Sequence, residues 1–264
     1  MNNLGLNKLI FITTAVGSLV AGAAGVLSPD IYRAVVSDRL LPGAYAQDLF
    51  VVGAALVMIA LTLRLKSGDH RKAAVLFGLL GFFFYAFAIY AIEQVYTLFY
   101  PLYLAVLAVS FYGLVHGLAS MRLAGLEALT IHSAVRIGAA GYGLFIAVLF
   151  NCIWLSQLIP LLRAGDRIEY TFSVYIIDLV FIMPAFAITA VLAIRKRGLG
   201  LIGLPALFIV GAVILAPLAL GELLKPIRYG EPMDSSAFWL YGTLSLIFLV
   251  VATGYLLALR RESR

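Results

Sequence analysis

The stretch Tyr45–Gly68, YAQDLFVVGAALVMIALTLRLKSG, decides the fold, because a similar stretch returns at Tyr175–Gly198, YIIDLVFIMPAFAITAVLAIRKRG. Aligned without a gap, at an offset of 130 residues, the two share seven identical residues in 24. Each places an aspartate, Asp48 or Asp178, before an apolar run that ends in a basic cluster. An apolar helix of about 20 residues crosses roughly 30 Å of hydrocarbon. The pattern therefore predicts two membrane helices, each with an acid near one end.

The composition extends this reading to the whole chain. Of the 264 residues, 63% are hydrophobic and 12% are charged, and the mean hydropathy of +1.04 is far too high for a soluble domain. We expect an all-α polytopic membrane protein with about eight transmembrane helices in one compact domain. The apolar spans lie near Leu9–Leu27, Ala46–Leu63, Ala73–Ala91, Pro101–Ser120, Ile137–Leu158, Val174–Ile194, Leu201–Leu220 and Ala237–Leu259.

The positive charges indicate an orientation. The net charge of +6 would suggest a nucleic-acid partner in a soluble chain, but here the basic residues follow the ends of apolar spans. On alternate sides of the predicted spans, 13 Lys and Arg residues fall on one side and six on the other. By the positive-inside rule, both termini are cytoplasmic. We therefore expect the cell (inner) membrane as location, the lipid bilayer as partner and no nucleic acid.

A second pair of segments supports an internal repeat. LSPDIYRAVVSDR from Leu27 aligns with LSQLIPLLRAGDR from Leu155 at an offset of 128. We predict two four-helix repeats, residues 1–125 and 126–264, which enter the membrane in the same orientation because each has an even number of helices. Such parallel repeats occur in transporters. The alternative is that apolar segments resemble one another through composition alone.

Acidic residues recur at the predicted outer ends of the spans. Glu93 and Glu222 follow Asp48 and Asp178 by 45 and 44 residues. Because an acid inside a membrane is costly, it usually faces a cavity or a partner. We expect these four acids, with Tyr90 and Tyr96, to line an outward-facing ligand site. The alternatives are that the acids are hydrated or cap helix N-termini, and that the tyrosines belong to an interfacial belt.

Other common sites have no basis in the sequence. P-loop, HExxH, GxSxG and usable GxGxxG motifs are absent, and the three histidines are scattered. We therefore predict no cofactor and no metal site. The single cysteine, Cys152, lies inside an apolar span and is expected to be a packing residue.

One family resemblance accompanies these motifs. AQDL in the second span, YIIDL in the sixth and YAFAIYAIEQVYTLFYPLYLAVLAVSFYGL across the third and fourth resemble a group of uncharacterised bacterial multi-pass membrane proteins. That group has a QD-L helix, a tyrosine-rich third helix and an NPLF-like start to the fourth, where this chain has Tyr100 in place of Asn. The resemblance implies a helical inner-membrane protein and no particular activity.

Three functions remain open at this point. The first is a carrier or binding protein for a small solute or cation, with the acids in a pocket at the repeat interface. The second is a membrane enzyme that acts on a lipid or isoprenoid through carboxylate acid–base chemistry. The third is a non-catalytic membrane partner or assembly protein. The repeat and the paired acids favour the first.

Overall fold

The computed structural model describes residues 4–122, 126, 129–166, 168 and 171–261, and within them eight helices are long and apolar enough to span a membrane. This confirms the predicted all-α polytopic fold. Seven of the eight spans are built on α1 (Leu4–Leu27), α2 (Leu41–Leu63), α3 (His70–Ile92), α4 (Tyr100–Arg122), α5 (Ser133–Ala164), α8 (Gly198–Leu224) and α9 (Ser235–Ala258). The remaining span consists of α6 (Phe172–Ile177), the π-helical turn η4 (Asp178–Ile182) and α7 (Met183–Ile194).

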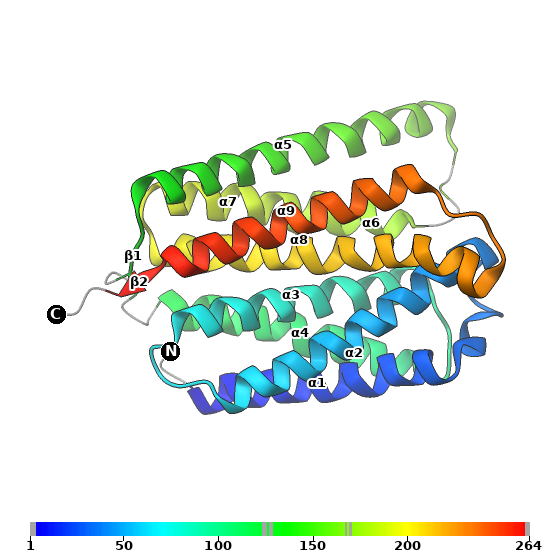
Figure 1. Ribbon diagram of the computed structural model, residues 1–264, viewed down its shortest axis with the longest axis horizontal. Helices are drawn as coiled ribbons and strands as arrows, with labels where there is room; N and C mark the ends of the chain where they lie inside the picture. Colours follow the sequence, from blue (N-terminus) through cyan, green and yellow to red (C-terminus); the bar gives the residue numbers. More distant parts are fainter. Residues whose placement is uncertain (1–3, 123–125, 127–128, 167, 169–170, 262–264) are drawn as a thin grey trace.

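Short elements join the long helices. The 3₁₀ turns η1 (Pro29–Tyr32) and η2 (Asp38–Leu40) connect α1 to α2, and a π-helical turn, η5 (Lys225–Tyr229), follows α8. At the opposite end, β1 (Leu129–Thr130) pairs with β2 (Arg260–Arg261) in a two-residue antiparallel ladder. The first and last described residues lie at this same end of the bundle (Figure 1), as an even number of spans requires.

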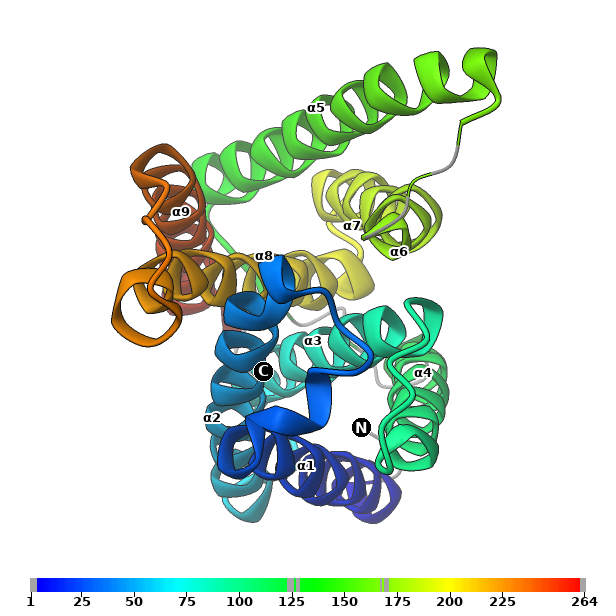
Figure 2. The same cartoon turned by 90° about the vertical axis from the view of Figure 1, so that its right-hand side faces the viewer.

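The helices form two groups that meet along α3 and α8 (Figures 1 and 2). In the first group, α1 packs on α2 and α4, and α3 packs on α4. In the second group, α5 packs on α7 and α9, and α8 packs on α9. The helix contacts within the first group thus match those within the second, as expected for a duplicated unit. The repeat itself stays a prediction. Its proposed boundary at residue 125 lies outside the described residues.

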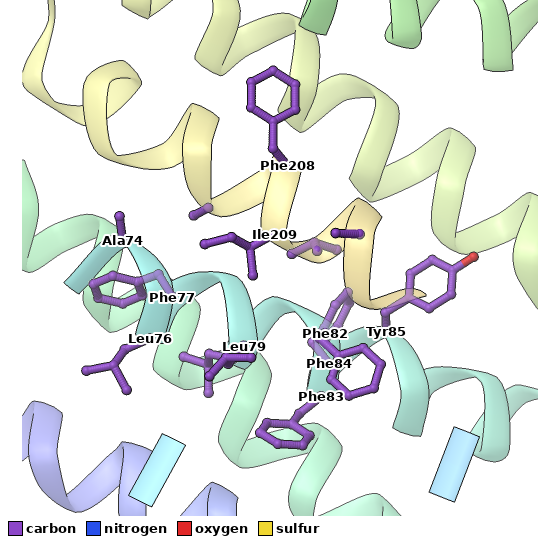
Figure 3. Close-up of a cluster of buried hydrophobic side chains, with 14 of the residues drawn as sticks. Ala74, Leu76, Phe77, Leu79, Phe82, Phe83, Phe84, Tyr85, Phe208 and Ile209 are labelled. Atoms are coloured by element: carbon purple, nitrogen blue, oxygen red, sulfur yellow. The ribbon is translucent and has the colours of Figure 1, made fainter. Parts of the chain in front are cut away.

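Close packing joins α3 to α8. A Cβ atom at Gly78 would lie 2.9 Å from the carbonyl oxygen of Ala206, so the glycine lets the two backbones approach. Beside it, Phe82 and Phe83 of α3 and Phe208 of α8 are buried in one apolar cluster (Figure 3). Residues from both groups therefore share one core, which fits the expectation of one compact domain.

Polar side chains fix the helix ends. Asp234 accepts hydrogen bonds from the backbone N–H groups of Ser236 and Ala237 and so caps the start of α9. Arg136 is 6% exposed and donates to the carbonyl oxygen of Ala193 at the end of α7. Arg71 donates in the same way to the carbonyl of Leu259, just beyond α9. These two arginines, which the sequence indicated only as topology markers, also fasten helix C-termini to their neighbours.

The fifth span differs from the others. α5 runs obliquely along one side of the molecule and leans away from α6 at its far end (Figure 2). Many of its apolar side chains are exposed, among them Phe145 and Val148. Cys152 is also exposed, so the prediction that it is a packing residue was wrong. The sequence showed that it lies in an apolar span but not which way the helix faces.

Candidate functional site

Asp48 lies in a closed cluster of tyrosines. Its side chain, on α2, is 1% exposed. Tyr32 in η1 donates a hydrogen bond to Oδ2 at 2.7 Å, and Tyr90 on α3 donates to Oδ1 at 2.9 Å. Burial raises the pKa of Tyr32 well above its ordinary value, so this hydroxyl keeps its proton and remains a donor. Tyr90 was predicted beside the acids, and the structure brings it to Asp48.

The first helix closes over this aspartate. A Cβ atom added at Gly25 of α1 would lie 1.7 Å from Oδ2 of Asp48 and 2.7 Å from the Tyr32 hydroxyl oxygen. Gly22, one turn earlier, lies against Val51 of α2 in the same way. The absence of side chains at these positions lets α1 cover Asp48 directly.

Asp178 has a different environment although it occupies the matching place in the sequence. It is 7% exposed and accepts a hydrogen bond on Oδ2 from Nε1 of Trp154 at 2.9 Å. Tyr85 on α3 lies close to it as well. Asp178 begins the π-helical turn η4, a type of helix distortion often found at functional sites. Unlike Asp48, it lines a pocket.

This pocket, called the Asp178 pocket below, has a volume of about 310 Å³ and lies where the two helix groups meet. α3, α5, α8 and α9 contribute walls, together with the span of α6, η4 and α7. Among the described residues that line it, Asp178 is the only Asp, Glu, Lys, Arg or His. Most of the others are apolar or aromatic, which is typical of small-molecule sites with a few polar anchors.

The lining changes from polar to apolar along the span that carries Asp178, along α5 and along α9. Asp178 lies near the start of its span, and Phe186 lies two turns further on. On α5, Trp154 is beside the carboxylate and Ile146 is two turns deeper. Eight residues of α-helix correspond to about 12 Å. The polar members of the lining are Gln47, Tyr85, Trp154, Thr171, Tyr175, Asp178 and Tyr241, and the deeper apolar members include Phe82, Ile146, Met183, Phe186, Gly211 and Phe248.

Aromatic contacts hold the polar end in place. The rings of Trp154 and Tyr175 meet edge to face, with centroids 5.0 Å apart. The Tyr175 hydroxyl donates to Oε1 of Gln157 at 2.6 Å. In Figure 3 the Tyr85 hydroxyl points away from the buried phenylalanine cluster. The carboxylate thus has aromatic neighbours that other contacts hold in place.

Glu93 caps the start of a helix. It follows α3 and accepts hydrogen bonds from the backbone N–H of Ser173 at 2.8 Å and of Thr171 at 3.1 Å. A carboxylate at these N–H groups caps the start of α6, where the helix dipole favours negative charge. Glu93 therefore ties the first helix group to the span that carries Asp178. This is the capping alternative considered for the aspartates, realised by a glutamate from another helix.

Glu222 and Tyr96 also have partners outside the Asp178 pocket. Glu222 forms an ion pair with Lys225, with Nζ 2.7 Å from Oε1, and accepts a hydrogen bond from the backbone N–H of Asp234. Tyr96 is 60% exposed and its ring packs edge to face on Tyr100. Of the six residues predicted to bind a ligand, Asp178 is thus the one that lines this pocket. The four acids do not converge on it, because each of the others is already engaged by different neighbours.

Sequence reasoning did not name Trp154 or Tyr85 as a site residue. One cue was present for Trp154, because it is one of only two tryptophans and lies within an apolar span. Its contact with Asp178, 24 residues away, depends on how α5 packs, which no local pattern encodes.

Two further observations bear on the identity of the site. Within the described part of the chain, no three His, Cys, Asp or Glu side chains come together in a way that could hold a metal ion. The chain matches no protein-family model, no curated protein and no solved structure.

Proposed function

We propose that this integral membrane protein binds a small organic cation in the Asp178 pocket, as a carrier does for its solute. One observation carries the proposal: among the described residues of a mostly aromatic and apolar lining, Asp178 is the only Asp, Glu, Lys, Arg or His. A carboxylate with no basic side chain among the described residues of its pocket is complementary to a positive ligand. The faces of aromatic rings attract cations as well, and organic cations in particular.

The hydrogen bonding of Asp178 is compatible with a bound cation. Trp154 is a neutral donor, so it stabilises the carboxylate without neutralising its charge. A bound cation would supply the missing charge. The described residues of the lining offer no second carboxyl group as a partner for acid–base catalysis, and we therefore place the lipid-modifying enzyme below the binding role.

The gradient of the lining refines the class of ligand. A positive head fits beside Asp178, and an apolar substituent fits the deeper end between Ile146 and Phe186. Burial of one methylene group is worth about 0.8 kcal/mol, or roughly fourfold in affinity. A short alkyl chain on the cation should therefore strengthen binding until the apolar end is filled.

The span that carries Asp178 also has a feature suited to movement. The π-helical turn η4 interrupts it at the aspartate, and Pro184 follows directly at the start of α7. Helix distortions of this kind allow local bending. The site helix therefore has a place at which it can flex during a carrier cycle, as required for alternating access.

The test compares an organic cation with an uncharged analogue of the same shape. Choline and 3,3-dimethylbutan-1-ol have nearly the same shape, but only choline is charged. We expect isothermal titration of the purified protein to show binding of choline, tighter binding of butyl- and hexyltrimethylammonium, and at least tenfold weaker binding of the alcohol. Uptake of radiolabelled choline into proteoliposomes then tests transport. Equal affinity for choline and the alcohol would contradict the proposed site.

We further propose that the protein lies in the cell (inner) membrane with both termini in the cytoplasm. The support is the excess of Lys and Arg at the ends of the spans that face the termini. With Cys152→Ser as background, Ser235→Cys should react with an impermeant maleimide on intact cells. Ser67→Cys should react only after permeabilisation. The reverse pattern would mean the opposite orientation.

A further inference from the structure

A second pocket, of about 220 Å³, lies between the turn η1, the start of α2 and the turn η5. Its lining includes two arginines, Arg33 directly after η1 and Arg228 in η5, together with Tyr45 of α2. The two arginines are far apart in the sequence, because Arg33 follows the first span and Arg228 follows α8, near the end of the chain. The fold has thus brought two guanidinium groups to one cavity.

Arg228 is held in place by its neighbours. Its guanidinium carbon lies 4.1 Å from the centroid of the Tyr45 ring, a stacking geometry that orients the planar group. It also lies close to the hydroxyl of Tyr229. That hydroxyl donates in turn to the carbonyl oxygen of Leu41 at 3.4 Å. The π-helical backbone of η5, which ends at Gly230 with φ of +68°, presents both side chains to α2.

Arg33 is fixed through one edge of its guanidinium. Its Nε lies 2.9 Å from Oδ1 of Asp30, and both side chains are largely exposed. The two terminal nitrogens are therefore not the atoms of this ion pair. One edge neutralises Asp30, while the fork formed by Nη1 and Nη2 carries the donors that recognise oxyanions.

The balance of charge in this pocket is positive. Two arginines and one aspartate line it, and the aspartate is already paired. Beside the acidic Asp178 pocket, the chain thus carries a second site of the opposite polarity.

We propose that this pocket binds a phosphate group between Arg33 and Arg228. Two guanidinium forks from different elements suit the several oxygens of a phosphate better than a single charge would. The position at the ends of membrane helices admits two sources of that group, a phospholipid headgroup or a soluble phosphate. Both present the same oxyanion to the same donors, and this proposal does not depend on what the Asp178 pocket binds.

The experiment separates these sources in phosphate-free buffer with the protein in maltoside micelles. Inorganic phosphate is one probe, and dioctanoyl phosphatidylglycerol is the other, with dioctanoylglycerol as its phosphate-free control. We expect at least one phosphate probe to raise the melting temperature, and the control to have no effect. A response to inorganic phosphate assigns a soluble ligand, and a response to the phospholipid alone assigns a headgroup.

Variants then test whether the probe binds in this pocket. Arg33→Gln and Arg228→Gln should each weaken the affinity of the active probe at least tenfold. Arg228→Lys, which keeps a cation beside Tyr45, should lose most of the affinity while it keeps the unliganded melting temperature. Arg39→Gln removes an exposed arginine of the neighbouring turn η2 and should bind as the wild type does. No response to either probe, or unchanged affinity in the Arg33 and Arg228 variants, would overturn the proposal.

Discussion

The Asp178→Asn variant is expected to lose affinity for alkyltrimethylammonium ions by roughly 30-fold or more. The substitution keeps the shape of the side chain and an oxygen that can accept from Trp154, but it removes the charge. Loss of one partner of a buried charge pair costs about 2–5 kcal/mol, and 1.4 kcal/mol corresponds to about tenfold in the dissociation constant. Isothermal titration with hexyltrimethylammonium measures this directly.

Asp48→Asn is the matched control, because the two aspartates occupy corresponding positions in the two similar stretches. Asp48 lies behind Tyr32 and does not line the Asp178 pocket. An asparagine there offers one acceptor to two tyrosine donors, so we expect a loss of stability of about 1–2 kcal/mol and no change in cation affinity. If Asp48→Asn weakened binding as much as Asp178→Asn, the assignment of one site to Asp178 would fail.

Gly25→Ala is expected to destabilise the bundle by about 1–3 kcal/mol, the usual cost of overpacking. The added methyl group would lie 1.7 Å from Oδ2 of Asp48 and 2.7 Å from the Tyr32 hydroxyl oxygen. It must push α1 away from α2 and disturb the hydrogen bond between Tyr32 and Asp48. Reversible unfolding in mixed detergent micelles measures the free energy of unfolding of the variant and the wild type.

Gly53→Ala provides the control on the neighbouring helix. No atom lies within 4 Å of a Cβ at this position of α2, and alanine favours a helix by about 1 kcal/mol over glycine. We expect equal or higher stability for this variant. If Gly25→Ala were as stable as the wild type, the close contact between α1 and Asp48 would not exist in the protein.

The sequence was sufficient to predict the fold class, for a physical reason. Each span must satisfy its own backbone hydrogen bonds in lipid, so length and apolarity alone indicate a helix. This is why the run at Ala73–Ala91 corresponds to α3, and why the interrupted span from Phe172 to Ile194 was still recognised as one segment. Pro184 indicates a distortion in this span, but no residue pattern shows that the distortion is a π-helical turn that begins at Asp178.

The sites depended on contacts between helices, which local patterns do not encode. Asp48 and Asp178 look alike in the sequence, but one is closed and the other lines a pocket. If the repeat is taken at its offset of 128 residues, Gly22 and Gly25 of α1 correspond to Phe150 and Ile153 of α5. Small residues let α1 cover Asp48, and larger ones at the same places of α5 leave space beside Asp178.

The central claim is that a cation occupies the space beside Asp178. Octyltrimethylarsonium tests this most directly, because arsenic takes the place of the ammonium nitrogen and scatters anomalously. In crystals grown with this ion, the account predicts an arsenic peak within about 6 Å of the Asp178 carboxylate and of the Trp154 or Tyr175 ring, with the chain extending toward Phe186. An arsenic peak outside the pocket, or a peak that persists unchanged in Asp178→Asn, would contradict it.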